Sequence, residues 1–227
     1  MKNIKKLPLI VSLLSLLIVF TPANADVKVV TSIKPIHSLA SYLMDGVGKP
    51  DLIVDGYASP HGFALKPSHA KMLQNADLIF WVGEDLENFL EKPLKSIAKK
   101  AEKIELIEIK GLKKLEFRER NIFEGHDDHE HDEHKEHGHK EDKHDDHHEH
   151  AHGEHDPHIW LDPMNAKVIL SEMAEHLIEN DQENASKYKT NLKKANKDID
   201  KLVKKVKSEL NKDFKSIVFH DAYQYFE

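Results

Sequence analysis

The sequence contains no cysteine among its 227 residues. No disulfide can therefore stabilise the fold, and no thiolate can bind a metal ion. Any metal site in this chain must use histidine, aspartate and glutamate side chains. The pattern GxSxG is absent as well, and HExxH occurs only at residues 148–152, inside a run of histidine and acidic residues without the apolar periodicity of a helix. Both points disfavour a zinc hydrolase, although three histidines with one open position could activate water. We therefore expect a protein that is not an enzyme.

Long apolar runs are lacking after the first 25 residues. Lysines precede an apolar run at residues 9–20, and the tripeptide ANA follows at residues 23–25. This order is typical of a secretory signal peptide over residues 1–25, with cleavage before Asp26. A membrane anchor is the weaker alternative because the run is shorter than the roughly 20 residues of a spanning helix. No cysteine follows the run, so a lipoprotein anchor is also disfavoured. We expect an exported, periplasmic protein.

Positive charge is in deficit. The formal net charge is −7, and removal of the three lysines in the signal peptide takes it to −10. A chain this acidic is a poor partner for nucleic acid. Nothing in the sequence indicates an oligomer, so we expect a monomer.

Short apolar runs alternate with helical periodicity over residues 26–123. Pro35 and Pro67 stand where a helix is expected to begin. A repeated order of strand, helix and strand predicts an α/β lobe built on a parallel sheet with helices on both faces. The expected strands cover residues 27–32, 51–54, 78–82 and 104–107, and the expected helices begin at residue 35 and cover residues 67–75 and 86–99.

The composition changes abruptly at residues 124–156 to histidine, aspartate, glutamate and lysine. Such a segment cannot bury a core, so we predict a disordered loop. Its imidazoles offer many weak metal sites, because none is preorganised, and they lose metal near pH 5 as they become protonated. A purely solvating acidic linker is the alternative. The histidines of this tract are His126, His129, His131, His134, His137, His139, His144, His147, His148, His150, His152 and His155.

Ordered sequence resumes after the histidine-rich segment. Residues 157–183, with a helix at 164–179, are expected to complete the N-terminal lobe. Residues 184–212 contain a helix of about 27 residues, about 40 Å long, which we interpret as a rigid helix linking two lobes. A coiled-coil stalk is the alternative interpretation. Residues 213–227, with a strand at 216–219, would then begin a C-terminal lobe that is largely missing, so we expect a shortened chain.

Three histidines stand where a strand or an apolar turn meets a loop. His61 follows the second expected strand, His158 lies where the polar tract meets an apolar turn, and His220 ends the last expected strand. Because ligands bind at the carboxyl ends of parallel strands, we expect these three side chains to share one cleft. Three imidazoles and one oxygen donor suit tetrahedral Zn²⁺, whereas Mn²⁺ prefers more carboxylates. Structural roles are expected for the remaining histidines outside the tract, which are His37, His69 and His176.

Several spaced motifs give the chain a family resemblance. They are TSIKP at residues 31–35, His61 with LKPS at 65–68, NADL at 75–78, WVG at 81–83, HIWLDP at 158–163 and FHDAY at 219–223. With these motifs in this order, the chain resembles the zinc-specific solute-binding proteins of ATP-driven importers, the ZnuA type within the cluster of zinc- and manganese-binding proteins.

The resemblance implies two α/β lobes joined by a long helix, with Zn²⁺ in the cleft between the lobes. It implies that His61, His158 and His220 are the metal ligands. It also implies capture of zinc in the periplasm and delivery to the membrane permease of a zinc ABC importer. Manganese-binding relatives tend to have a carboxylate at the position of His220. The alternatives are a binding protein of the same type for manganese or another divalent metal, and a histidine-rich metal buffer.

One residue departs from the family pattern. Some relatives have a glutamate directly before the first ligand, where this chain has Pro60. The fourth donor is therefore expected to be water or a residue of the C-terminal lobe. The resemblance places much of the surface that docks on the transporter in that lobe as well.

Overall fold

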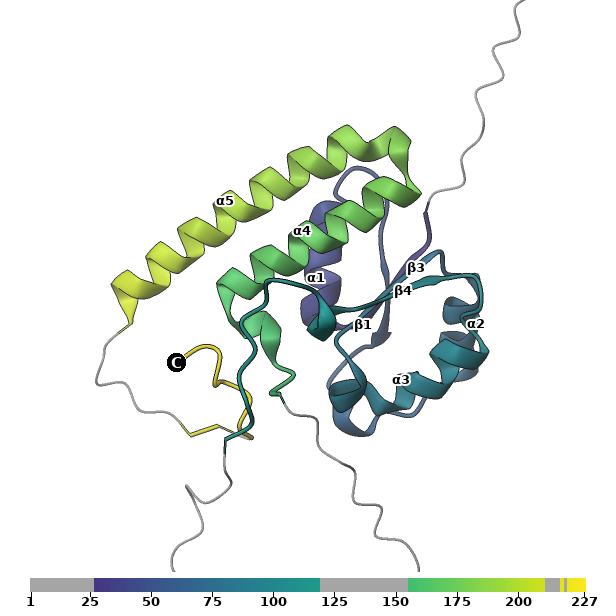
Figure 1. Cartoon of the computed structure of the whole chain (residues 1–227), viewed down its shortest axis with the longest axis horizontal. Coiled ribbons are helices and arrows are strands. Elements are labelled where there is room, and N and C mark those ends of the chain that lie inside the picture. Colours follow the sequence, from purple (N-terminus) through teal and green to yellow (C-terminus); the bar gives the residue numbers. More distant parts are fainter. Residues whose placement is uncertain (1–26, 119–154, 211–216, 219) are drawn as a thin grey trace, which may run out of the picture.

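A four-stranded parallel sheet forms the centre of the fold (Figure 1). The structure is a computed structural model and describes residues 27–118, 155–210, 217–218 and 220–227. The strand order is β2-β1-β3-β4, and every pair is parallel. The strands are β1 (Val29–Ile33), β2 (Asp51–Val54), β3 (Leu78–Trp81) and β4 (Glu102–Glu105). All residues of β1 and β3 are buried, as in central strands that are covered on both faces.

Helices cover the two faces of the sheet. On one side lie α1 (Lys34–Leu43), α4 (Pro163–Asn180) and α5 (Ala185–Glu209), and on the other lie α2 (Pro67–Asn75) and α3 (Glu84–Ser96) (Figure 1). A proline stands in the first turn of α1, α2 and α4, where its missing N–H costs no helical hydrogen bond. The predicted α/β class with a parallel sheet is confirmed.

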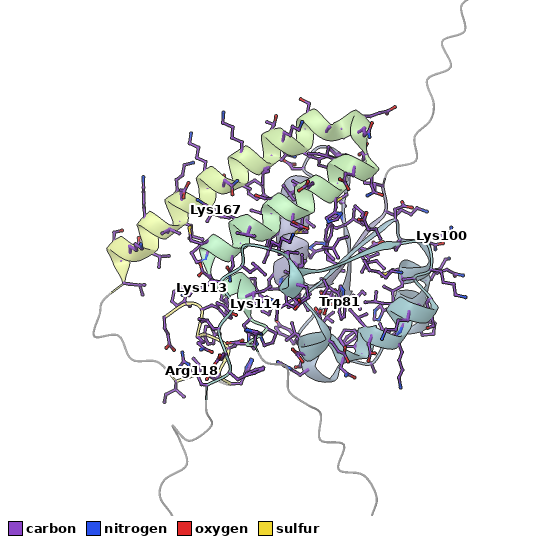
Figure 2. All side chains as sticks on the ribbon, viewed as in Figure 1. Trp81, Lys100, Lys113, Lys114, Arg118 and Lys167 are labelled. Atoms are coloured by element: carbon purple, nitrogen blue, oxygen red, sulfur yellow. The ribbon has the colours of Figure 1, made fainter. Side chains whose placement is uncertain are left out.

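The long helix α5 is confirmed at almost its predicted length. Tyr188, Asn191 and Ala195 in its first half are buried against the core. The Asn191 side-chain amide donates to the carbonyl oxygens of Leu43, at 2.7 Å, and Asp45, at 2.9 Å. On α4, Lys167 forms an ion pair with Asp200 of α5 (Figure 2). These contacts make the first half of α5 part of the lobe, which is not the arrangement of a stalk.

Several expectations concern residues that the structure does not describe. The signal peptide at residues 1–25 and the histidine tract up to His152 lie outside the described residues. At the end of that tract, His155 forms an isolated antiparallel bridge with Glu116. Asp156, also assigned to the loop from its composition, is described and is only 2% exposed. Among the described residues, no helix is both long and apolar enough to cross a membrane.

The strand expected at residues 216–219 is not found at the two of these residues that are described. Ile217 and Val218 are exposed and belong to no helix or strand. An apolar, β-branched run favours a strand only where a neighbouring strand can pair with it. Such a partner is lacking among the described residues around this segment.

A buried carboxyl group holds the turn between β3 and α3. The side chain of Glu87 is fully buried, and its Oε2 accepts the backbone N–H groups of Val82 (2.7 Å) and Gly83 (3.2 Å). Burial raises the pKa of Glu87 to about 7, and the two N–H groups oppose that rise. The group therefore changes charge within the ordinary working range of a protein.

This raised pKa predicts a pH-dependent stability. Between an unfolded pKa near 4.5 and the folded value of about 7, the native state binds more protons, so the free energy of unfolding falls as the pH rises. In Glu87→Gln, the decrease in the free energy of unfolding over this pH range should be smaller by roughly 2–4 kcal/mol. Denaturant unfolding at pH 5 and pH 8 measures the difference. Glu175→Gln, exposed on α4, is the control, and an equal effect in both variants would contradict the assignment.

Candidate metal centre

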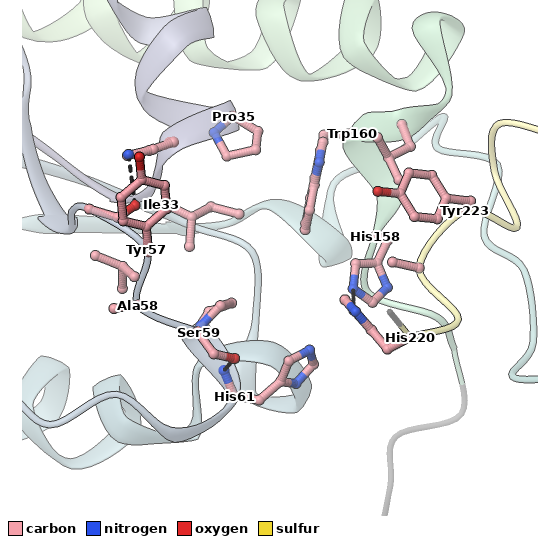
Figure 3. A pocket seen from close by; sticks show the side chains of 16 residues that line it. Ile33, Pro35, Tyr57, Ala58, Ser59, His61, His158, Trp160, His220 and Tyr223 are labelled. Atoms are coloured by element: carbon pink, nitrogen blue, oxygen red, sulfur yellow. Dashed lines mark hydrogen bonds between the residues drawn. The ribbon is translucent and has the colours of Figure 1, made fainter. Parts of the chain in front are cut away.

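His61 reaches the site from the loop that follows β2. It lies in a short 3₁₀ turn, η1 (Pro60–Gly62), and Ser59 Oγ accepts its backbone N–H at 3.3 Å. Because β2 is parallel to the other strands, this loop lies at the carboxyl edge of the sheet. The imidazole points across the cavity toward His158 and His220 (Figure 3). His61 thus lies at the carboxyl edge of the sheet, as expected for a residue that follows a strand in the sequence.

His158 is held by a neighbouring carboxylate. Its ring Nδ1 lies 2.7 Å from Asp156 Oδ1, which also accepts the backbone N–H of His158 at 2.9 Å. A carboxylate can only accept hydrogen bonds, so Nδ1 is the donor, which in the neutral ring leaves the lone pair on Nε2. Both residues are buried. The Asp156 carboxylate therefore fixes the tautomer and the orientation of His158.

His220 belongs to the C-terminal segment, residues 220–227, which folds back onto the lobe. The Tyr225 hydroxyl accepts the Leu115 N–H and donates to the Asp156 carbonyl, both at 2.9 Å. Arg118, seen beside this segment in Figure 2, pairs with Glu227 at 2.6 Å. These contacts bring His220 to the carboxyl edge of the sheet.

The three imidazoles meet at one point. One ring nitrogen of each lies within 4.8 Å of the others, and Nε2 of His220 is 3.4 Å from Nε2 of His158. Nitrogens bound to a tetrahedral ion at 2.0–2.1 Å are about 3.3 Å apart, by the geometry of such a site. The centroid of the His61 ring lies 5.9 Å from the centroid of the His158 ring and 5.8 Å from that of the His220 ring. The cluster has the size and donor type of a metal centre.

The electrostatics of the cluster favour a neutral ring at His61. Partial burial, and then the neighbouring imidazoles of His158 and His220, lower the pKa of His61. A neutral imidazole offers the lone pair that a cation requires.

The cluster opens into a cavity of about 630 Å³. Tyr57, Trp160 and Tyr223 contribute aromatic side chains to its wall (Figure 3). The edge of the Trp160 ring lies against His158, with centroids 5.4 Å apart. No carboxylate is among the described residues that line the cavity.

The other histidines of the described segments lie apart from this cluster. His37 Nε2 faces the Pro50 carbonyl at 3.1 Å, and His69 Nδ1 accepts the Lys66 N–H at 3.1 Å to cap α2. His176 is paired with glutamates on α4 and β4, and His155 lies in its bridge with Glu116. Sequence reasoning missed Asp156 and Tyr225. The spacing Asp-x-His at residues 156–158 was the one available signal for the former.

Comparisons with known proteins identify the class and then the family. The fold is that of periplasmic metal-binding proteins. It matches the Zn(II)-bound ZnuA-like domain of Streptococcus pneumoniae AdcA, with a TM-score of 0.63 and 18% identity over 88% of this chain and 62% of that one. It also matches an Mn-bound periplasmic metal binding protein from Candidatus Liberibacter asiaticus, with a TM-score of 0.59 and 20% identity over 80% and 56%. A family model described as "ZnuA: Zinc-uptake complex component A periplasmic" matches residues 29–227, and the chain belongs to this family.

Curated relatives of this chain are longer than the chain itself. The high-affinity zinc uptake system protein ZnuA of Brucella abortus (strain 2308) is 47% identical over 211 residues, which are 88% of this chain and 63% of that protein. The protein of that name from Paracoccus denitrificans (strain Pd 1222) is 41% identical over 90% of this chain and 64% of its own length. The chain thus spans about two thirds of the length of these relatives.

The lowered pKa of His61 can be measured directly in the metal-free protein. Its imidazole should titrate below the ordinary value of 6.5 in an NMR pH series. His220→Gln should raise this pKa, because it removes one neighbouring positive charge. His37→Gln is the control and should leave the His61 titration unchanged. A normal or raised pKa for His61 would contradict the convergence of the three rings.

Proposed function

We propose that this protein captures Zn²⁺ in the periplasm and delivers it to the membrane permease of an ATP-driven zinc importer. The observation that carries the proposal is the meeting of His61, His158 and His220 within 4.8 Å. The names of the Brucella and Paracoccus relatives support zinc as the cargo. Export through a signal peptide at residues 1–25 is part of the proposal, as is a gathering role for the histidine tract.

The three imidazoles are the proposed ligands. His158 is the preorganised one, because Asp156 orients it, and His61 and His220 close around the ion from two other loops. A set of three nitrogens without a carboxylate favours Zn²⁺ over Mn²⁺. Water or a residue outside the described segments supplies the fourth donor.

A binding role is favoured over hydrolysis by the surroundings of the ligands. A zinc hydrolase needs a general base near the metal-bound water. Besides the three histidines, the described lining of the cavity consists of Lys34, hydroxyl-bearing side chains and apolar residues, and it includes no carboxylate. The centre is therefore suited to holding an ion until it is transferred.

Replacement of the ligands tests the proposal. In the triple variant His61→Ala, His158→Ala and His220→Ala, the tightest Zn²⁺ site should weaken by more than about 100-fold, while the weaker sites of the histidine tract remain. Competition with a chromophoric chelator measures this affinity, and Mn²⁺ added in excess should not displace Zn²⁺ from the unaltered chain. His37→Ala is the matched control. Unchanged tight binding in the triple variant would refute the ligand assignment.

The role of Asp156 gives a separate prediction. Asp156→Ala should weaken Zn²⁺ binding by about 10–100-fold, because His158 loses the partner that fixes its tautomer. Asp156→Asn should have a smaller effect, since its amide oxygen can still accept the Nδ1 hydrogen. Asp55→Asn, an exposed carboxylate in the loop after β2, controls for the change in charge. If Asp156→Ala and Asp55→Asn had equal effects, orientation by Asp156 would be ruled out.

A further inference from the structure

A second group of metal-ligating side chains lies on the outer surface formed by β4 and α4. One ligand atom from each of Glu102, His176 and Glu179 lies within 4.8 Å of the others. His176 Nδ1 is 2.8 Å from Glu102 Oε1, and His176 Nε2 is 3.4 Å from Glu172 Oε1. Two elements that are far apart in the sequence thus bring an imidazole among three carboxylates.

This group is well separated from the three-histidine cluster. Glu102 begins β4 and therefore lies at the amino edge of the parallel sheet, whereas His61 follows β2 at the carboxyl edge. Along α4, His176 lies about 20 Å from Pro163, the residue that starts the helix close to His158. The two groups cannot share one ion.

The geometry of α4 suits a bound cation. Glu172, His176 and Glu179 are spaced by four and three residues, so they lie on one face of the helix. Glu172 and His176 border a surface hollow that also contains Glu105 and Glu108. Of the two lysines at this hollow, Lys103 directs its ammonium group to the Ala98 carbonyl at 2.9 Å, and Lys110 is the other. Negative charge therefore exceeds positive charge around the imidazole.

His176 separates this group from an ordinary patch of exposed carboxylates. Its Nδ1 is buried, yet the contact with Glu102 does not have the alignment of a hydrogen bond. The nearby Glu102 Oε2 accepts instead from the Asn180 amide at 3.0 Å, which leaves Oε1 directed at the ring. An ion between Nδ1 and the carboxylates would replace this poorly aligned contact with a coordinate bond and reduce the repulsion among the glutamates.

We propose that Glu102, His176 and Glu179 form a second, weaker site for a divalent transition-metal ion, with Glu172 beside it. Mixed imidazole and carboxylate donors accept Zn²⁺ and tolerate Mn²⁺ better than an all-nitrogen set does. The donors are partly exposed, so the site binds less tightly than a buried, preorganised one. It requires no contribution from the three-histidine cluster and is independent of the function proposed for that cluster.

A Zn²⁺ titration of the ¹⁵N-labelled full chain, followed through the imidazole nitrogen signals, distinguishes this site from all others. The His176 signals, identified by their loss in His176→Gln, should shift along a saturable curve that lies at higher Zn²⁺ than the curve of His61. Glu179→Gln should weaken the His176 response about tenfold or more, because it removes one anionic ligand. Glu175→Gln carries the same charge change on an exposed position of the same helix and should leave the curve unchanged.

Two results would overturn the proposal. His176 signals that do not move while those of His61 saturate would mean that His176 and its glutamates form an ion pair only. An equal loss in Glu179→Gln and Glu175→Gln would mean general attraction of cations to an acidic surface. If the proposed zinc site at His61, His158 and His220 were wrong, the result would be different: Zn²⁺ would not shift the His61 signals.

Discussion

The contact between the Asp156 carboxylate and His158 is the constraint on which the three-histidine cluster depends. A carboxylate that is 2% exposed is costly unless hydrogen bonds compensate for its burial. Asp156 obtains them from the ring and the backbone N–H of the same histidine. Its own carbonyl accepts the Tyr225 hydroxyl, and Tyr225 lies in the segment that contains His220. One buried residue thus orients one proposed ligand and helps to place another.

The parallel sheet explains why the two proposed sites differ in chemistry. Loops at the carboxyl edge leave the sheet and can converge, and there the chain places imidazoles beside aromatic side chains. At the amino edge, the start of β4 meets the side of α4, and carboxylates surround one imidazole. On α4 the regular helix fixes the spacing of the proposed ligands, but their side chains stay at least partly exposed. The converging loops at the carboxyl edge instead bury one proposed ligand, His158. This difference in burial accounts for the expected difference in affinity.

Local patterns predicted the fold better than they predicted the partners of the proposed ligands. The buried run at β3 and Pro67 at the start of α2 are local signals, and both elements lie where the sequence indicates. His61 could be chosen because it follows a strand. Asp156 could not, since its composition continues that of the histidine tract and its burial comes from contacts with distant residues. The same holds for Glu102 and His176, which are 74 residues apart and meet only in the folded chain.

If His61, His158 and His220 bind an ion as proposed, metal binding and docking of residues 220–227 are coupled. His220 is brought to the cluster by Tyr225, by the ion pair of Arg118 with Glu227, and by Gln224, whose amide donates to the Glu116 carbonyl at 3.1 Å. An ion that binds His220 together with His61 and His158 favours the docked segment, and by linkage the docked segment favours the ion to the same extent. Anything that draws this segment away therefore removes one nitrogen donor and lowers the affinity.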